Sequence, residues 1–140
     1  MFGDSLIEMK TEEAILLLDD DPEVTQTLGV LLEGEGYTIV AAHTGADGLR
    51  RIREGGVGLV LLDLRLPDVD GREVMREAQQ DPGAPEFIII TGNTALDSAI
   101  EAVERSAAGY LPKPVDFHRL SVIVRRVFER RRLLRENARL

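Results

Sequence analysis

The sequence predicts an α/β fold in which a five-stranded parallel sheet carries helices on both faces. Short β-rich apolar runs alternate with amphipathic stretches five times along the chain, which is the pattern of repeated strand-helix units. Two of these runs, Ile15–Leu18 and Leu59–Leu62, are apolar at every position, as expected of strands buried on both sides of a parallel sheet.

Each predicted strand is a short apolar run bounded by polar or turn-forming residues. The first and third runs both end in acidic residues, and the fifth ends in a proline-rich segment. The five strands are predicted, in chain order, at Ala14–Leu18, Tyr37–Ala42, Leu59–Leu62, Phe87–Ile90 and Gly109–Leu111.

The helix boundaries are predicted from proline and glycine positions. Pro22 favours a helix start, Asp21 is the expected N-cap, and the first helix should end at Gly34 or Gly36. The next three helices are predicted at about 46–54, 72–80 and 95–106. The helix at 46–54 should stop at the paired glycines that follow it, and the helix at 72–80 should end in a Pro/Gly loop.

The fifth helix is predicted from near Asp116 to the end of the chain. Its apolar residues follow helical spacing as far as Phe128, after which an arginine run at 130–132 predicts a solvated helix face. About 24 residues at ~1.5 Å each give roughly 36 Å, which is longer than the body of such a domain, so the last turns should project. We therefore divide the chain into a flexible segment (1–13), a domain (14–128) and a C-terminal helical extension or linker (129–140).

Five parallel strands with alternating crossovers favour the flavodoxin-like order 2-1-3-4-5. In this order the first and third strands are neighbours, so their carboxyl ends meet at one edge of the sheet. Asp19 and Asp20 follow the first strand and Asp63 follows the third, so these acids should share one pocket.

Composition limits the classes of function. The 140 residues fit one domain, cysteine is absent, and the net charge of −8 argues against nucleic-acid binding by the domain as a whole. The apolar runs are too short for a signal peptide or a membrane span.

Clustered carboxylates hold a cation or bind protons tightly, and oxygen ligands favour Mg²⁺. A carboxylate beside Mg²⁺ can also act as a nucleophile toward a phosphoryl group. At the end of the fourth strand, Thr91 offers a hydroxyl and Gly92 leaves space for a phosphoryl group. Lys113, after the fifth strand, offers a cation for the carboxylates or a phosphoryl oxygen. Asp68 and Asp70 are predicted to shape a turn rather than to bind metal.

In combination these motifs resemble the response-regulator receiver domain, the phosphoacceptor module of two-component signalling. The resemblance covers roughly Ala14 to Phe128 and rests on residues 16–21, 62–71, 90–92 and 109–114, which read LLLDDD, LDLRLPDVDG, ITG and GYLPKP.

The resemblance implies a role for each site residue. Asp63 would accept a phosphoryl group, and Asp19 and Asp20, together with Asp63 and the backbone carbonyl of Arg65, would hold Mg²⁺. The remaining roles concern the phosphoryl group and the switch: Thr91, Gly92 and Lys113 would bind the phosphoryl group, Thr91 and Tyr110 would change on activation, and the Lys113–Pro114 peptide bond would be cis.

The resemblance also implies partners and a location. The phosphoryl group would come from a sensor histidine kinase or phosphotransfer protein in the cytoplasm, and the domain would signal through protein contacts rather than as an enzyme. We further expect a phosphorylation-dependent homodimer that includes the extension, where Leu133, Asn137 and Leu140 have coiled-coil spacing, and an output domain beyond this chain.

Three alternatives compete with this interpretation. A haloacid-dehalogenase-type phosphatase would use Asp19 as nucleophile in its Asp-x-Asp motif, but would leave Asp63 unexplained. A flavodoxin needs a phosphate loop after the first strand, where this chain is anionic. A degenerate receiver that acts only by binding should lack a site residue, and none is missing.

Overall fold

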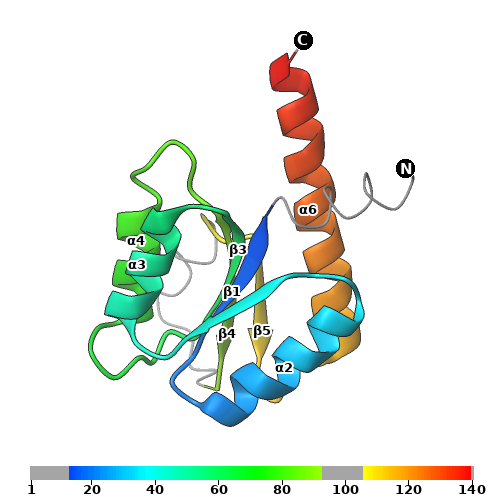
Figure 1. The fold of residues 1–140 in the computed structure, drawn as a ribbon. Helices are drawn as coiled ribbons and strands as arrows, with labels where there is room; N and C mark the ends of the chain where they lie inside the picture. The colour runs from blue at the N-terminus through cyan, green and yellow to red at the C-terminus, as the bar shows by residue number, and fades with distance from the viewer. Residues whose placement is uncertain (1–12, 93–105, 140) are drawn as a thin grey trace.

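The computed structural model describes residues 13–92 and 106–139 and shows a single five-stranded sheet. All neighbouring strands are parallel and their order is 2-1-3-4-5, as predicted (Figure 1). The strands are β1 (Ala14–Leu18), β2 (Ile39–Ala42), β3 (Val57–Leu62), β4 (Glu86–Thr91) and β5 (Gly109–Pro112).

Four helices cover the sheet in the described part of the chain, against five in the prediction. The missing one, predicted at 95–106, falls almost wholly outside the described residues. Among the helices described, none is both long and apolar enough to cross a bilayer. The four are α2 (Pro22–Gly34), α3 (Gly45–Glu54), α4 (Gly71–Ala78) and α6 (Phe117–Arg139).

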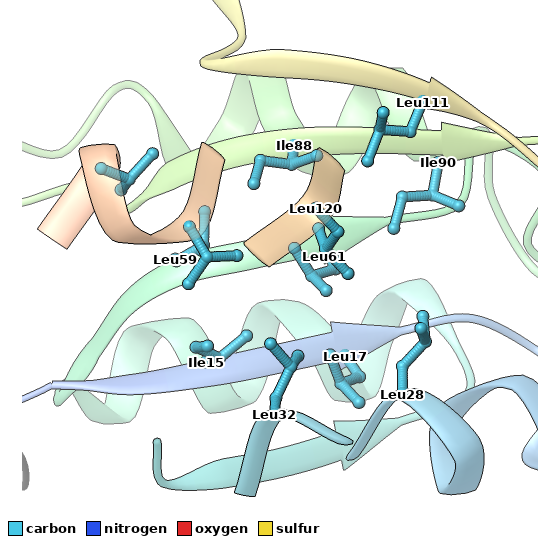
Figure 2. Packing of buried hydrophobic residues seen from close by; sticks show 12 residues of the cluster. Ile15, Leu17, Leu28, Leu32, Leu59, Leu61, Ile88, Ile90, Leu111 and Leu120 are labelled. Atoms are coloured by element: carbon cyan, nitrogen blue, oxygen red, sulfur yellow. The ribbon is translucent and has the colours of Figure 1, made fainter. Parts of the chain in front are cut away.

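The helices form two layers because side chains alternate between the faces of each strand. Ile15 and Leu17 of β1 pack with residues of α2 and α6, whereas Leu16 and Leu18 pack with residues of α3 and α4. These two pairs of helices lie on opposite faces of the sheet (Figure 1). Figure 2 shows the first layer, in which Leu28 and Leu32 of α2 and Leu120 of α6 pack over β1, β3, β4 and β5. This core fixes the strand ends that carry the candidate site.

The element boundaries agree with the prediction to within about two residues, and β2 shows the physical reason for one of the differences. Asp21 caps α2 as predicted, because its side chain accepts a hydrogen bond from the Glu23 amide at 3.0 Å. The second strand begins at Ile39 instead of Tyr37, however. The Tyr37 amide donates to the Leu32 carbonyl at the end of α2, and its ring stacks on Phe128 at 5.4 Å. Tyr37 therefore joins the helix layer rather than the sheet.

The last helix, α6, is continuous over 23 residues and runs past the end of the sheet at which the strands begin (Figure 1). We call this end the amino edge, and the end at which the strands finish the carboxyl edge. The prediction of a fully solvated arginine face is wrong for Arg131, which is largely buried. Its guanidinium donates to both carboxylate oxygens of Glu13 at 2.7–3.2 Å and to the Ala84 carbonyl at 3.4 Å. Arg135 also approaches Glu13, at 3.5 Å. We call Glu13, Arg131 and Arg135 the amino-edge cluster.

Candidate functional site

The carboxyl edge of the sheet brings together the acids that follow β1 and β3. The Asp63 amide donates to the Leu18 carbonyl at 2.9 Å, which continues the hydrogen bonding of these two strands by one residue. Asp19 and Asp63 are only 5% and 6% exposed, whereas Asp20 is exposed. Oxygen atoms of the three carboxylates lie within 4.8 Å of one another. The predicted convergence is therefore present.

Lys113 lies across the two buried carboxylates. Its Nζ is 2.7 Å from Asp19 Oδ2 and 2.8 Å from Asp63 Oδ2. Burial disfavours the charged ammonium, but hydrogen bonds and the charges of both aspartates outweigh it and raise the pKa of Lys113 above its ordinary value. The Lys113 amide donates to the Thr91 carbonyl at 3.0 Å, and the following peptide bond to Pro114 is cis.

Backbone amides orient the second oxygen of each buried carboxylate. Asp19 Oδ1 accepts from the Asp21 amide at 2.9 Å, and Asp63 Oδ1 accepts from the Arg65 amide at the same distance. Both carboxylates are thus held in fixed orientations before any ligand arrives. We call Asp19, Asp20, Asp63 and Lys113 the carboxyl-edge cluster.

The carboxyl-edge cluster fits a divalent cation. The cluster holds three carboxylates and the one ammonium of Lys113, which contacts two of them, so negative charge is in excess, and oxygen atoms of the carboxylates lie within 4.8 Å of one another. Hard cations such as Mg²⁺ prefer carboxylate and carbonyl oxygens.

The remaining predicted site residues lie at neighbouring positions. Thr91 ends β4 and is buried, and Gly92 follows it, with nothing within 4 Å of the position a Cβ would take. Tyr110 lies further back along β5, opposite Ile89, and is half-buried. The carboxyl edge therefore gathers the acids, the lysine and the threonine, while Tyr110 lies beside them on the edge strand.

Two contacts at this edge, made by Gly71 and His43, were not predicted from the sequence. Gly71 begins α4 so close to β3 that a Cβ would lie 2.6 Å from the Asp63 carbonyl oxygen, which excludes any larger residue without backbone movement. His43 Nδ1 lies 2.9 Å from the Asp19 carbonyl oxygen. Asp70, one of the two predicted turn residues, is the N-cap of α4. Gly71 and His43 thus constrain the backbone beside Asp63 and Asp19, and Asp70 fixes the start of α4.

A family model described as the response regulator receiver domain matches residues 15–125 of the chain. The chain belongs to this family. The receiver domain is a signalling module of two-component response regulators rather than an enzyme of the ordinary kind, and receiver domains bind Mg²⁺ through an aspartate cluster such as Asp19, Asp20 and Asp63.

Curated relatives of this receiver domain are transcriptional regulatory proteins. It is 41% identical over 103 residues to GlrR of Escherichia coli K12, covering 73% of this chain and 23% of GlrR. It is 36% identical over 120 residues to ZraR of Klebsiella oxytoca, covering 85% of this chain and 27% of ZraR. The chain thus spans about a quarter of the length of these relatives. These findings give no support to the phosphatase alternative.

Solved receiver structures share the fold over most of their length. The signal receiver domain of a Luxo repressor protein from Vibrio parahaemolyticus matches with a TM-score of 0.80 and 28% identity, over 87% of this chain and 94% of that one. The response regulator TrrA of Thermotoga maritima, solved in complex with Mg²⁺ and BeF, matches with a TM-score of 0.74 and 29% identity, over 82% and 98%.

Proposed function

We propose that this receiver domain takes a phosphoryl group from a sensor histidine kinase or a phosphotransfer protein onto Asp63, with Mg²⁺ as cofactor. The observation that carries the proposal is the place of Asp63. Its buried carboxylate shares one pocket with two further acids and touches the Lys113 ammonium at 2.8 Å. A nucleophile, a metal site and a cation for the incoming group are then side by side.

The transfer follows from this arrangement. A carboxylate oxygen of Asp63 attacks the phosphorus of a phosphohistidine, the phosphorus–nitrogen bond breaks, and its electron pair returns to the imidazole nitrogen, which takes up a proton. Lys113 can pair with a phosphoryl oxygen as the carboxylate charge is consumed. The Thr91 hydroxyl and the open space at Gly92 accommodate the other oxygens.

Asp19, Asp20, Asp63 and the Arg65 carbonyl would hold Mg²⁺. The ion supplies positive charge that offsets the charge of the carboxylates and the phosphoryl oxygens as they approach. Lys113 alone balances only one of the three carboxylates, which is why we assign a cation to this pocket.

Acetyl phosphate with Mg²⁺ tests the proposal. We expect intact-mass measurement to detect one acid-labile phosphoryl group on the wild type and none on Asp63→Asn. Asp20→Ala should lose both Mg²⁺ binding and phosphorylation. A phosphoryl group that persists in Asp63→Asn and is lost in Asp19→Asn would instead favour Asp19 as nucleophile and the phosphatase reaction.

The loops that follow β4 and β5 connect the phosphorylation site to the protein-interaction surface and could carry the signal to it. Thr91 ends β4 and Lys113 directly follows β5, so a phosphoryl group that draws them inward biases Tyr110 and the surface around β5 and α6. We propose that this strengthens self-association in the cytoplasm, with the α6 extension pairing in parallel, where Leu133 is 48% exposed. An output domain beyond this chain would receive the signal.

Sedimentation with and without a beryllofluoride phosphoryl mimic tests the dimer. We expect the mimic to shift the protein from monomer toward dimer in the presence of Mg²⁺, and Asp63→Asn to remain unchanged. A monomer under both conditions contradicts the dimer, and a dimer that forms without the mimic removes phosphorylation as its control.

A further inference from the structure

Asp68 ties the loop after Asp63 to a different element of the fold. This residue lies between β3 and α4, yet its Oδ1 accepts from the Gly45 amide at 2.8 Å and its Oδ2 from the Ala46 amide at 3.0 Å. These amides belong to the first two residues of α3. Hydrogen bonds from Ala46 and Gly45 hold the pKa of Asp68 below its ordinary value, so the tether is made by the ionised carboxylate.

The start of α3 already has a cap of its own. Thr44 Oγ1 accepts from the Asp47 amide at 3.1 Å, in the usual geometry of an N-cap. The loop is nevertheless laid tightly on this helix end, since a Cβ at Gly45 would lie 2.3 Å from Val69 Cγ2. The contacts of Asp68 therefore constrain the loop in addition to capping the helix.

The same loop is closed at its base, beside the carboxyl-edge cluster. The Gly71 amide donates to the Leu64 carbonyl at 2.9 Å, and Arg65 forms an isolated antiparallel bridge with Asp70. Arg65 follows Asp63 by two residues and donates its amide to that carboxylate. A segment fixed at its base and tethered at its tip holds the Arg65 carbonyl in one place.

We propose that Asp68 is a positioning residue that, by tethering the tip of this loop to α3, sets the place of the Arg65 carbonyl and thereby the Mg²⁺ affinity of the carboxyl-edge cluster. The proposal rests on the proposed function, in which that carbonyl is a metal ligand. A backbone ligand cannot reorient independently of its loop, so the residue that fixes the loop also fixes the ligand.

Mg²⁺ titration by calorimetry, with a matched control, tests this role. Asp68→Ala should weaken Mg²⁺ binding about tenfold, the lower end of the range for residues that support metal ligands. Thr44→Ala removes a cap from the same helix end without releasing the loop, so its Mg²⁺ affinity should equal that of the wild type. Equal Mg²⁺ affinities for Asp68→Ala and Thr44→Ala would overturn the tether.

Asp68→Asn separates the tether from the charge. An asparagine keeps one acceptor oxygen for the Gly45 amide but lacks the charge, so its affinity should fall between those of the wild type and Asp68→Ala. An asparagine variant that binds Mg²⁺ as weakly as the alanine variant would mean that a hydrogen bond from α3 to this side chain does not support the metal site, and the tether would be rejected. If Asp68→Ala does not fold, Asp68→Asn is compared with Thr44→Ala instead, and equal Mg²⁺ affinities of these two variants would overturn the tether.

Asp20→Ala distinguishes failure of this inference from failure of the proposed function. If Asp20→Ala loses Mg²⁺ while Asp68→Ala binds it as the wild type does, the metal site stands and the tether alone is wrong. If Asp20→Ala binds Mg²⁺ as well as the wild type, the metal site itself is elsewhere and both proposals fall.

Discussion

The amino and carboxyl edges of the sheet each carry a partly buried group of opposite charges, and the balance of positive and negative charge differs between them. At the carboxyl edge three carboxylates lie close together, and the Lys113 ammonium contacts two of them, those of Asp19 and Asp63. At the amino edge one carboxylate, Glu13, is shared by two guanidinium groups. The carboxyl edge is therefore left with excess negative charge, and the amino edge has more donors than its carboxylate needs.

This difference separates a binding site from a structural contact better than burial does. Both edges contain carboxylates that are less than 15% exposed. Burial alone would raise the pKa of Glu13, but the hydrogen bonds and charges of Arg131, with the charge of Arg135, lower it overall. The amino-edge cluster is therefore neutralised by its own side chains, whereas the carboxyl-edge cluster keeps negative charge that a cation would offset.

The largest effect on stability should come from breaking the amino-edge cluster. Arg131→Met leaves Glu13 largely buried without its bidentate partner and removes a donor from the Ala84 carbonyl. We expect a loss of about 2 kcal/mol in the free energy of unfolding, measured by urea denaturation. Arg132→Met changes an exposed neighbour on the same helix and should lie within about 0.5 kcal/mol of the wild type. Equal losses in both variants would contradict a specific contact.

The carboxyl edge was predictable from the sequence, and the amino edge was not. Parallel strands with continuous apolar runs must collect their carboxyl ends at one edge, so the acids after residues 18 and 62 had to meet. Glu13 and Arg131 are 118 residues apart and meet because Gly58 leaves room, a Cβ there lying 2.7 Å from Glu13 Cδ. Such a fit depends on how α6 packs. The contacts of Asp68 with α3 were not predicted either, because they depend on how the loop after β3 packs against the start of α3.

Mg²⁺ should stabilise the protein through one edge only. At ten times its dissociation constant, a ligand that binds only the folded state adds about 1.4 kcal/mol to the free energy of unfolding. We expect this gain in the wild type and in Glu13→Gln, and its loss in Asp20→Asn, measured by thermal unfolding with Mg²⁺ or with a chelator. A gain that survives in Asp20→Asn would place the ion outside the carboxyl-edge cluster.

Acidic pH should abolish the contribution of Glu13 to the free energy of unfolding. Because its pKa in the folded protein lies below the ordinary value of 4.5, its ionised form is stabilising above that pH, and the contribution is lost as the pH falls through the lower, folded value. Glu13→Gln should therefore be about 1 kcal/mol less stable than the wild type near neutral pH. The two proteins should converge below pH 4.5 in urea denaturation. A constant difference across this range would mean that packing, not charge, holds the contact.

The smallest predicted change in the free energy of unfolding is a gain rather than a loss, and it comes from Asp20→Asn. Asp20→Asn makes the same chemical change as Glu13→Gln, yet it removes a charge from a cluster in which carboxylates outnumber cations three to one. Without Mg²⁺, relief of the repulsion should raise the free energy of unfolding by up to about 1 kcal/mol, a modest amount because Asp20 is exposed and screened by solvent. Urea denaturation in the presence of a chelator measures it. Asp81→Asn removes the same charge from an exposed turn and serves as the control for the net charge of −8. An equal gain in both variants would assign the effect to net charge, whereas a gain confined to Asp20→Asn would show that the carboxyl edge trades stability for its place to bind a cation.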